Sequence, residues 1–227
     1  MGKKYNRRKT KNKRLYIVVE GQSEEEFVKD MLAPLFIQHC VYTYPMIIHT
    51  SKGHKGGFVN YQHLRNDINR LLLSQGQDVI VTTFVDFFRC PDLPYKDDWC
   101  NIQSHSKQVE LMEKAMEKDI SDRRFIPYIQ LHEFEALLFS SADGFIKYYN
   151  QEISDRIQGI IDSYDNPEDI NSSPEGAPSK RLLGIIQDYD KVMFGNTIAL
   201  EIGIDTILNK CPRFKAWIEL LIERCCQ

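Results

Sequence analysis

Leu15-Tyr16-Ile17-Val18-Val19-Glu20 is the stretch of sequence that decides the fold. A run of consecutive apolar residues, mostly β-branched or aromatic, indicates a strand covered by helices on both faces, and therefore a central strand of a parallel sheet. The strand ends on a carboxylate, and Gly21 follows. Ser23 and Glu26 have the spacing of a capping box, which predicts that a helix begins at Ser23. The segment reads as a strand-turn-helix unit with Glu20 at the turn.

Two further predicted strands also end beside carboxylates. Residues 79–85 are apolar and lead to Asp86, and residues 125–131 lead to Glu133 and into a short helix. Strands that alternate with helices predict an α/β fold with a mostly parallel sheet flanked by helices, and sites in such folds form outside the carboxyl ends of the strands. Glu20, Asp86 and Glu133 are all expected at that edge.

The length and composition predict one compact unit. The chain has 227 residues and 42% hydrophobic residues, enough for one substantial core. We expect a basic tail at 1–14, an α/β core at 15–140, and a mainly helical region at 141–227 packed on the core. No stretch approaches the roughly 20 apolar residues that span a bilayer, and the amino-terminal segment lacks the apolar part of a signal peptide. The sequence therefore predicts a cytoplasmic protein with no membrane partner.

The charge is distributed unevenly along the chain. Residues 1–14 hold eight Lys or Arg and no acid; removing these eight from the 29 basic residues leaves 21 against 32 acidic ones, a formal charge of about −11 for the rest. A basic arm on an acidic body suits a protein that holds a polyanion near carboxylates. A solubilising tail would have the same composition. The six cysteines show no CxxC spacing, which argues against a zinc site and a disulfide framework.

The carboxylates at the strand ends indicate a divalent metal site. Glu20, Asp86 and Glu133, with Glu24 one helical turn after Glu20, would repel one another strongly if they met without a cation. Hard oxygen ligands select Mg²⁺ or Mn²⁺, and an incomplete carboxylate shell leaves room for water and phosphate oxygens, as phosphodiester hydrolysis requires. Each acid taken singly could instead be a cap or a helix-dipole partner. The sequence leaves open whether one or two ions bind.

Glu133 and Glu135 are alternative ligands. In a helix their side chains point about 200° apart, so at most one of them should reach the metal. We expect Glu133, which is nearer the strand end, and assign Glu135 to the support of a neighbouring side chain.

A short strand at 46–49 is expected before a basic, glycine-rich loop. Lys52, His54 and Lys55 of this loop could contact backbone phosphates, although such loops are common and no GxxxxGK[ST] motif is present. A P-loop ATPase is therefore excluded.

Several motifs together resemble the prokaryotic domain-of-unknown-function family numbered 4276. The resemblance is carried over nearly the whole chain by residues 18–27, 84–88, 127–139, 173–181 and 211–217. That family is similar to the Toprim superfamily of topoisomerases, primases and OLD-type nucleases, and its members resemble partners of ATPases in phage defence. The resemblance implies a Toprim-like fold, nuclease activity and an ATPase partner protein.

The resemblance also implies residue roles. Glu20 matches the first Toprim glutamate, Glu24 the additional acid of OLD-type nucleases, and Asp86 the first aspartate of the Asp-x-Asp motif. Phe88 stands where the second aspartate is expected, so Glu133 or Glu135 would have to replace that ligand. Lys180 is similar to the lysine that OLD-type nucleases place near the scissile phosphate. Lys180 and Arg181 could aim cations and a helix amino terminus at one anion, or simply be an exposed helix start.

Two hypotheses follow. In the first, Glu20, Glu24, Asp86 and Glu133 hold Mg²⁺ or Mn²⁺, water activated by the metal attacks a phosphodiester, and Lys180 stabilises the developing charge. In the second, the chain is a non-catalytic Toprim-like regulator or scaffold of an ATPase. Primase-like nucleotidyl transfer shares the metal chemistry and would differ in its product. The sequence does not distinguish DNA, tRNA or another RNA as the nucleic-acid partner, and it leaves open whether the chain forms a homodimer.

Overall fold

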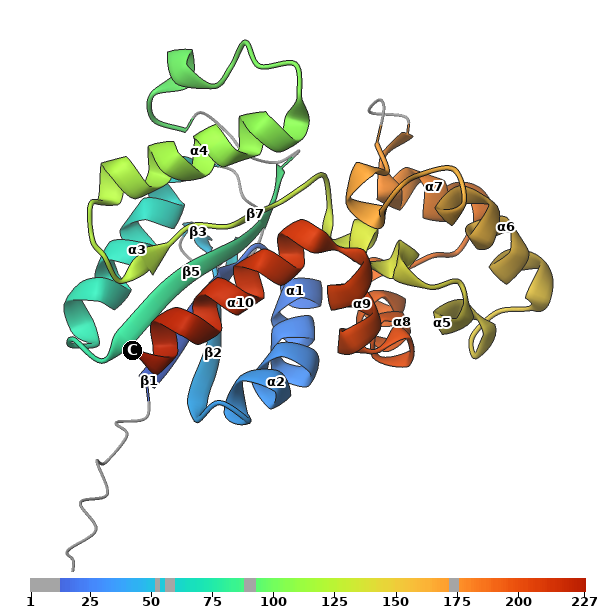
Figure 1. Ribbon diagram of the computed structural model, residues 1–227, viewed down its shortest axis with the longest axis horizontal. Helices are drawn as coiled ribbons and strands as arrows, with labels where there is room; N and C mark the ends of the chain where they lie inside the picture. The colour runs from blue at the N-terminus through green and yellow to red at the C-terminus, as the bar shows by residue number, and fades with distance from the viewer. Residues whose placement is uncertain (1–12, 52–53, 56–59, 88–92, 172–175) are drawn as a thin grey trace, which may run out of the picture.

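The sheet at the centre of the protein is parallel. A computed structural model describes residues 13–51, 54–55, 60–87, 93–171 and 176–227, with the side chains of 50, 51, 54 and 55 left out. The strand order is β2-β1-β5-β6, β7 also pairs with β5, and these pairs are all parallel. The predicted α/β class, with a mostly parallel sheet, flanking helices and a helical carboxyl-terminal part, is confirmed (Figure 1).

The elements described are, in chain order, β1 (Lys13–Val19), α1 (Gln22–Phe27), η1 (Val28–Leu32), α2 (Ala33–Ile37), β2 (Val41–Ile47), β3 (His49–Ser51), β4 (His54–Lys55), α3 (Tyr61–Ser74), β5 (Val79–Asp86), η3 (Lys96–Asp98), α4 (His105–Ile120), β6 (Phe125–Ile126), β7 (Ile129–Gln130), η4 (Phe134–Ser140), α5 (Asp143–Ile146), α6 (Gln151–Ile161), η5 (Pro167–Asp169), α7 (Pro178–Ile185), η7 (Lys191–Gly195), α8 (Asn196–Ile202), α9 (Ile204–Lys210) and α10 (Pro212–Cys226). Among them, no helix combines the length and the apolar character needed to cross a membrane.

Helices cover both faces of β1, as its continuous apolar sequence predicts. Ile17 and Val19 are fully buried in the core formed with α1, α2 and α10, whereas Val18 is fully buried in the core formed with α3 and α4. Alternate side chains of a strand point to opposite faces, so a strand covered on both sides must be apolar throughout. Figure 1 shows α3 and α4 on one side of the sheet and α1 and α2 on the other.

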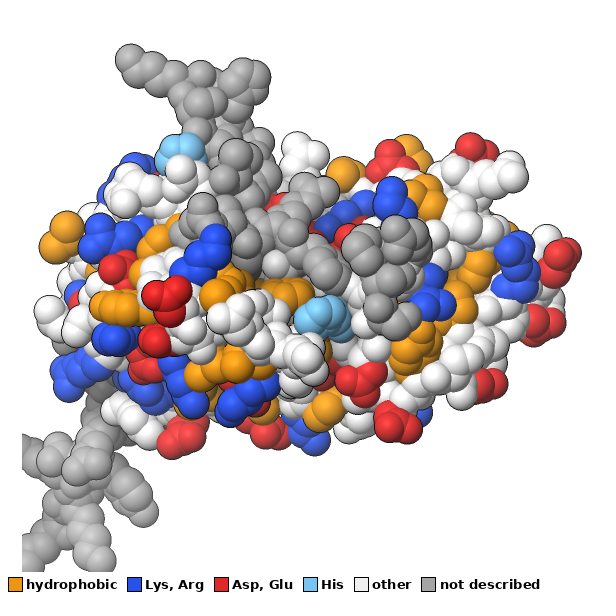
Figure 2. All heavy atoms as spheres, turned by 90° about the horizontal axis from the view of Figure 1, so that it is seen from above, with side chains coloured by type: hydrophobic (Ala, Val, Ile, Leu, Met, Phe, Trp, Pro, Cys, Tyr) orange, Lys and Arg blue, Asp and Glu red, His pale blue; other side chains and the backbone are white. Residues whose placement is uncertain are grey.

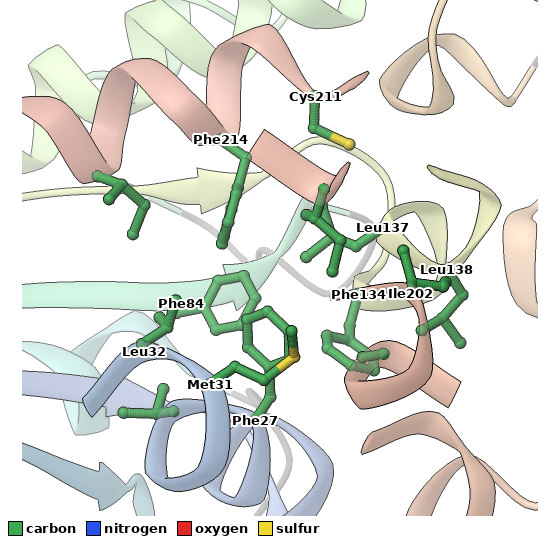
Figure 3. Close-up of a cluster of buried hydrophobic side chains, with 14 of the residues drawn as sticks. Phe27, Met31, Leu32, Phe84, Phe134, Leu137, Leu138, Ile202, Cys211 and Phe214 are labelled. Atoms are coloured by element: carbon green, nitrogen blue, oxygen red, sulfur yellow. The ribbon is translucent and has the colours of Figure 1, made fainter. Parts of the chain in front are cut away.

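An aromatic cluster joins the carboxyl-terminal helices to the sheet. The rings of Phe27, Phe84, Phe134 and Phe214 come from α1, β5, η4 and α10 and meet in one core (Figure 3). The Phe27 and Phe134 centroids lie 5.3 Å apart in an edge-to-face arrangement, and those of Phe84 and Phe214 lie 6.0 Å apart. Such aromatic pairs stabilise the packing beyond the area they bury. Residues far apart in the sequence therefore hold η4 and α10 against the end of β5.

Trp217 of α10 also packs against the sheet in this cluster. Its ring stacks on Tyr128 at a centroid distance of 4.2 Å, and its Nε1 donates to Thr82 Oγ1 at 3.0 Å. We expect Trp217→Ala to lower the free energy of unfolding by about 3–5 kcal/mol because it removes a buried aromatic side chain. Urea denaturation measures this change. Leu220→Ala, on the same helix but 40% exposed, is the matched control and should cost about 1 kcal/mol or less.

Two predicted strands differ in extent from those in the structure. The strand expected at 46–49 is β2, which starts at Val41 and pairs along all of β1 from Lys13 to Val19. It is an edge strand, where Pro45 is tolerated and Tyr42 and Tyr44 stay partly exposed, so it lacks the continuous apolar pattern of a central strand.

The strand expected at 125–131 is divided into β6 and β7. Pro127 lacks an amide N–H and interrupts the ladder with β5. Thr83 of β5 bridges the gap, because its hydroxyl accepts from Tyr128 N at 2.9 Å and lies 2.7 Å from Tyr128 O. The helix expected to begin at Ser23 begins at Gln22, with Gly21 as its cap and no side-chain cap hydrogen bond, so the capping-box prediction is wrong.

Candidate active site

Three buried carboxylates meet where β1 and β5 end. Glu20 follows β1 directly and Asp86 is the last residue of β5; the two strands are neighbours, with Val19 paired to Phe84. Glu24 lies in the first turn of α1. These side chains are only 6%, 4% and 3% exposed respectively. Acids are rarely buried this completely unless they are paired or bind a cation, so the edge is built for positive charge.

Lys191 is the cation that Glu24 and Asp86 contact in the structure. Its Nζ lies 2.8 Å from Glu24 Oε1, 3.3 Å from Glu135 Oε2 and 3.5 Å from Asp86 Oδ2. The lysine side chain is 30% exposed, whereas the three carboxylate side chains are nearly buried. One ammonium ion therefore partly neutralises three carboxylates at the mouth of the cluster.

The ionisation of the cluster reflects this crowding. Burial raises the pKa of Asp86 well above its usual range and Lys191 opposes that shift, while the charges of Glu24, Glu20 and Glu135 add to it. Burial also raises the pKa of Glu135, again against the influence of Lys191. For Lys191 burial alone would lower the pKa, but the surrounding carboxylates outweigh it and keep the ammonium protonated. A single positive charge is thus insufficient to satisfy the site.

A tight turn places Lys191 at the site. Asp190 caps η7 by accepting from Val192 N at 2.8 Å and from Met193 N at 3.1 Å. Gly195 closes the turn, and a Cβ at that position would lie 3.2 Å from the Phe134 ring. The lysine Nζ lies 5.5 Å from the centroid of the same ring. Capping, a close glycine contact and an aromatic surface together direct the side chain toward the carboxylates.

Lys191 is the site residue that the sequence prediction missed. It lies 105 residues beyond Asp86, in a π-helical turn without an apolar period or a known motif. Its only local signal is the capping aspartate before it and the glycine four residues after it. Neither indicates a contact with distant strand ends.

The two candidate glutamates after β7 have different partners. Asp86 Oδ1 accepts from Phe134 N at 2.9 Å, which fixes the start of η4 against β5. Glu135, one residue on, is 3% exposed and joins the Lys191 cluster. Glu133 caps η4 in an extended conformation, and its Oε2 accepts from Ser179 N at 2.9 Å. Glu135 therefore contacts the Lys191 ammonium, whereas Glu133 holds the first turn of α7. The expectation that Glu133 is the metal ligand stays a prediction.

Two of the basic candidates, Lys180 and Arg181, lie near the start of α7. Lys180 is exposed in the first turn of α7, next to the residue that Glu133 holds. Arg181 donates through Nε to Gly176 O at 2.8 Å and lies over the Tyr164 ring at 5.3 Å, so its guanidinium orders the segment before α7. Lys52, Phe88 and the side chains of His54 and Lys55 fall outside the described residues.

The basic amino-terminal segment joins the fold at the end remote from the carboxylates. β1 starts at Lys13, within the predicted 1–14 tail, and Glu20 follows its other end. A strand rises about 3.3 Å per residue, so the point of attachment lies roughly 23 Å from Glu20. Residues 1–12 are themselves outside the description.

The carboxylates of this cluster are the type of ligand that a hard divalent cation prefers. Glu20, Glu24, Asp86 and Glu135 would supply the carboxylate oxygens. In the described ranges, however, no three His, Cys, Asp or Glu side chains already form a metal-holding group. The carboxylates are arranged around the Lys191 ammonium, which would have to withdraw before an ion could take its position.

These features define an α/β protein with an acidic centre at the carboxyl edge of its sheet. The chain belongs to the family described as a domain of unknown function, DUF4276, whose model matches residues 19–222. The predicted family membership is thereby confirmed. No curated protein matches the chain.

Two solved structures are similar in outline. The carboxyl-terminal region of the Burkholderia pseudomallei OLD protein aligns with a TM-score of 0.47 and 16% identity, over 95% of this chain and 99% of that one. The corresponding region of the Xanthomonas campestris pv. campestris OLD protein aligns with a TM-score of 0.43 and 16% identity, over 94% and 95%.

Proposed function

We propose that this protein is a Mg²⁺- or Mn²⁺-dependent nuclease that hydrolyses nucleic-acid phosphodiesters, acting as the effector of an ATPase-linked anti-phage defence system. The observation that carries the proposal is the contact of Glu24, Asp86 and Glu135 with one ammonium ion at the carboxyl ends of a parallel sheet. Open α/β sheets bind ligands at this edge. Buried anions that exceed the available positive charge are destabilising unless they serve a further cation.

Glu20, Glu24, Asp86 and Glu135 are the residues that would hold the ion. The ion would activate water for attack on the phosphodiester and stabilise the charge that develops on the phosphate. Phe134 N fixes the orientation of Asp86 through Oδ1, which leaves Oδ2 directed at the cation position. Glu133 anchors the turn that carries the exposed Lys180, which in this proposal contacts the bound phosphate.

Lys191 has two positions in this proposal. Without a divalent ion it neutralises the carboxylates. With the ion present its ammonium withdraws but remains tethered to the capped η7 turn, within reach of a phosphate bound at the mouth of the site. The Lys191 side chain is 30% exposed, so its ammonium can move toward the solvent. Lys191 is therefore a candidate, together with Lys180, for stabilising negative charge on the scissile phosphate.

Cleavage assays test the proposal. Purified protein is incubated with DNA, RNA and tRNA in Mg²⁺ and in Mn²⁺, with and without its ATPase partner, beside Glu20→Ala and Lys180→Ala variants. We expect at least one substrate to be cut by the wild type and not by Glu20→Ala. Cleavage that survives Glu20→Ala would place the chemistry elsewhere, and the substrate that is cut decides between DNA and RNA.

One observation favours a second candidate, a non-catalytic regulator or scaffold of an ATPase. Lys191 already occupies the cation position, and an ammonium that stays there would make the cluster a structural ion-pair network. In that case no substrate is cut even when the ATPase is supplied, and divalent ions do not change the stability of the protein. The ATPase partner and the oligomeric state, including a homodimer, enter both candidates as proposals.

A further inference from the structure

A second charged feature lies at the opposite end of the sheet from the carboxylates. A pocket of about 420 Å³ opens at the amino ends of β1 and β5. It is lined by Lys13, Gln77, Val79, Ile80, Arg123, Arg124, Arg224 and Gln227. No aspartate or glutamate is among these lining residues. Figure 2 shows Lys and Arg side chains along the lower left of the face that it presents, interspersed with acidic ones.

Hydrogen bonds hold cationic side chains of this pocket in place, but most of their charge is not neutralised by a carboxylate. Lys13 Nζ donates to Arg224 O at 3.1 Å, and the Arg224 guanidinium donates to Arg123 O. Carbonyl oxygens satisfy these donors without neutralising their charge. Within the part of the chain that the structure describes, Arg124 is the lining cation paired with a carboxylate, that of Asp122 at 2.6 Å. Arg123 is exposed between them. Three cationic side chains are therefore available to an anion.

The lining has the donor groups that bind phosphate esters. Guanidinium groups present planar pairs of donors that match phosphate oxygens, and the lysine adds a point charge. The pocket is open and its apolar floor is small, which does not suit a compact hydrophobic ligand.

We propose that this pocket binds the phosphate backbone of the nucleic acid whose scissile bond lies at the carboxylates, an inference that rests on the proposed function. β5 runs from Val79 in the pocket lining to Asp86 in the acidic centre. At about 3.3 Å per residue the two sites are roughly 23 Å apart in a straight line, and because helices cover β5 on both faces, a nucleic acid that reaches both must pass over the surface and span at least about seven nucleotides at about 3.4 Å per step. Substrates shorter than this engage one site only.

Fluorescence anisotropy in EDTA tests the inference without requiring cleavage. The probes are labelled single-stranded and duplex oligonucleotides of about 5 and about 20 residues, chosen to lie below and above the roughly seven-residue span. We expect Arg123→Glu and Lys13→Gln to weaken binding of the long probe about tenfold and to reduce the salt dependence by about one counterion each. Lys215→Ala, on α10 outside the pocket, is the matched control and should bind as the wild type does. Unchanged thermal unfolding of each variant establishes that it folds.

The outcomes separate this inference from the proposed function. Wild-type affinity in Arg123→Glu and Lys13→Gln overturns the backbone site, whatever the cleavage assays show. An equal loss in Lys215→Ala also overturns it, because Lys215 lies outside the pocket. Weaker binding in Arg123→Glu and Lys13→Gln but not in Lys215→Ala supports the site even if the acidic centre proves inactive.

Discussion

Asp86→Asn should abolish cleavage while leaving the protein at least as stable as the wild type. Asparagine has nearly the same size, and its Oδ1 can still accept from Phe134 N. Burial raises the pKa of Asp86, against the opposing effect of Lys191 and with a further rise from the neighbouring carboxylates, so keeping this side chain ionised in the folded protein costs stability. A neutral side chain should therefore raise the free energy of unfolding at pH 8 by about 1 kcal/mol or more. Losing one anionic ligand should lower the cleavage rate by about a thousandfold.

The combination of these two effects is the informative result. A residue with only a structural role loses stability when it is replaced, whereas a residue kept charged for catalysis loses activity and gains stability. Urea denaturation and single-turnover cleavage measure the two quantities. Asp188→Asn, at an exposed acid outside the cluster, should change neither. A destabilised Asp86→Asn that retains cleavage would contradict the assignment.

Lys191→Met has the second large expected effect, on stability in the absence of metal. Methionine keeps the apolar stem over Phe134 and removes the ammonium that contacts Glu24, Asp86 and Glu135. Breaking a buried ion pair from one side costs about 3–5 kcal/mol because charges are left uncompensated. We expect a loss of this size by urea denaturation in EDTA at pH 8, and recovery of most of it with Mn²⁺. Lys147→Met, at an exposed lysine paired with Glu201, is the matched control.

The loss in free energy of unfolding caused by Lys191→Met should also depend on pH. Asp86 and Glu135 have pKa values raised by burial, so both bind protons more tightly in the folded state than in the unfolded chain. Such groups favour folding at low pH, and the contribution is lost as the pH rises through their folded-state pKa values. Without Lys191 the pKa values rise further, so the deficit should be smaller at pH 5 than at pH 8. A deficit that is the same at both pH values, and that Mn²⁺ does not relieve, would show that Lys191 acts only through packing.

The parts of the site on β1 and β5 could be predicted from the sequence because their signal is local. A continuous apolar run indicates a central strand, and the residue that ends it must lie at the carboxyl edge, which correctly placed Glu20 and Asp86. Glu24 could be placed near the same edge because it lies in the first turn of the next helix. These inferences need no knowledge of long-range contacts.

The remaining site residues depend on contacts that no local pattern encodes. Whether Glu133 or Glu135 faces the carboxylates is decided by the extended backbone at Glu133 and by Ser179 N, which holds that side chain elsewhere. Lys191 reaches the site only because η7 packs on the ring of Phe134 through Gly195. The division of 125–131 into β6 and β7 likewise depends on a hydroxyl of the neighbouring strand.

The central claim is that Glu20, Glu24, Asp86 and Glu135 form a divalent-metal centre from which Lys191 withdraws. The most direct test is a crystal structure of the protein soaked in Mn²⁺, with an anomalous difference map recorded for the metal. The account predicts a peak among these four carboxylates, at about 2.0–2.2 Å from their oxygens, with the Lys191 ammonium displaced outward. A map with no peak there at saturating Mn²⁺, and Lys191 still in contact with Glu24, would contradict it.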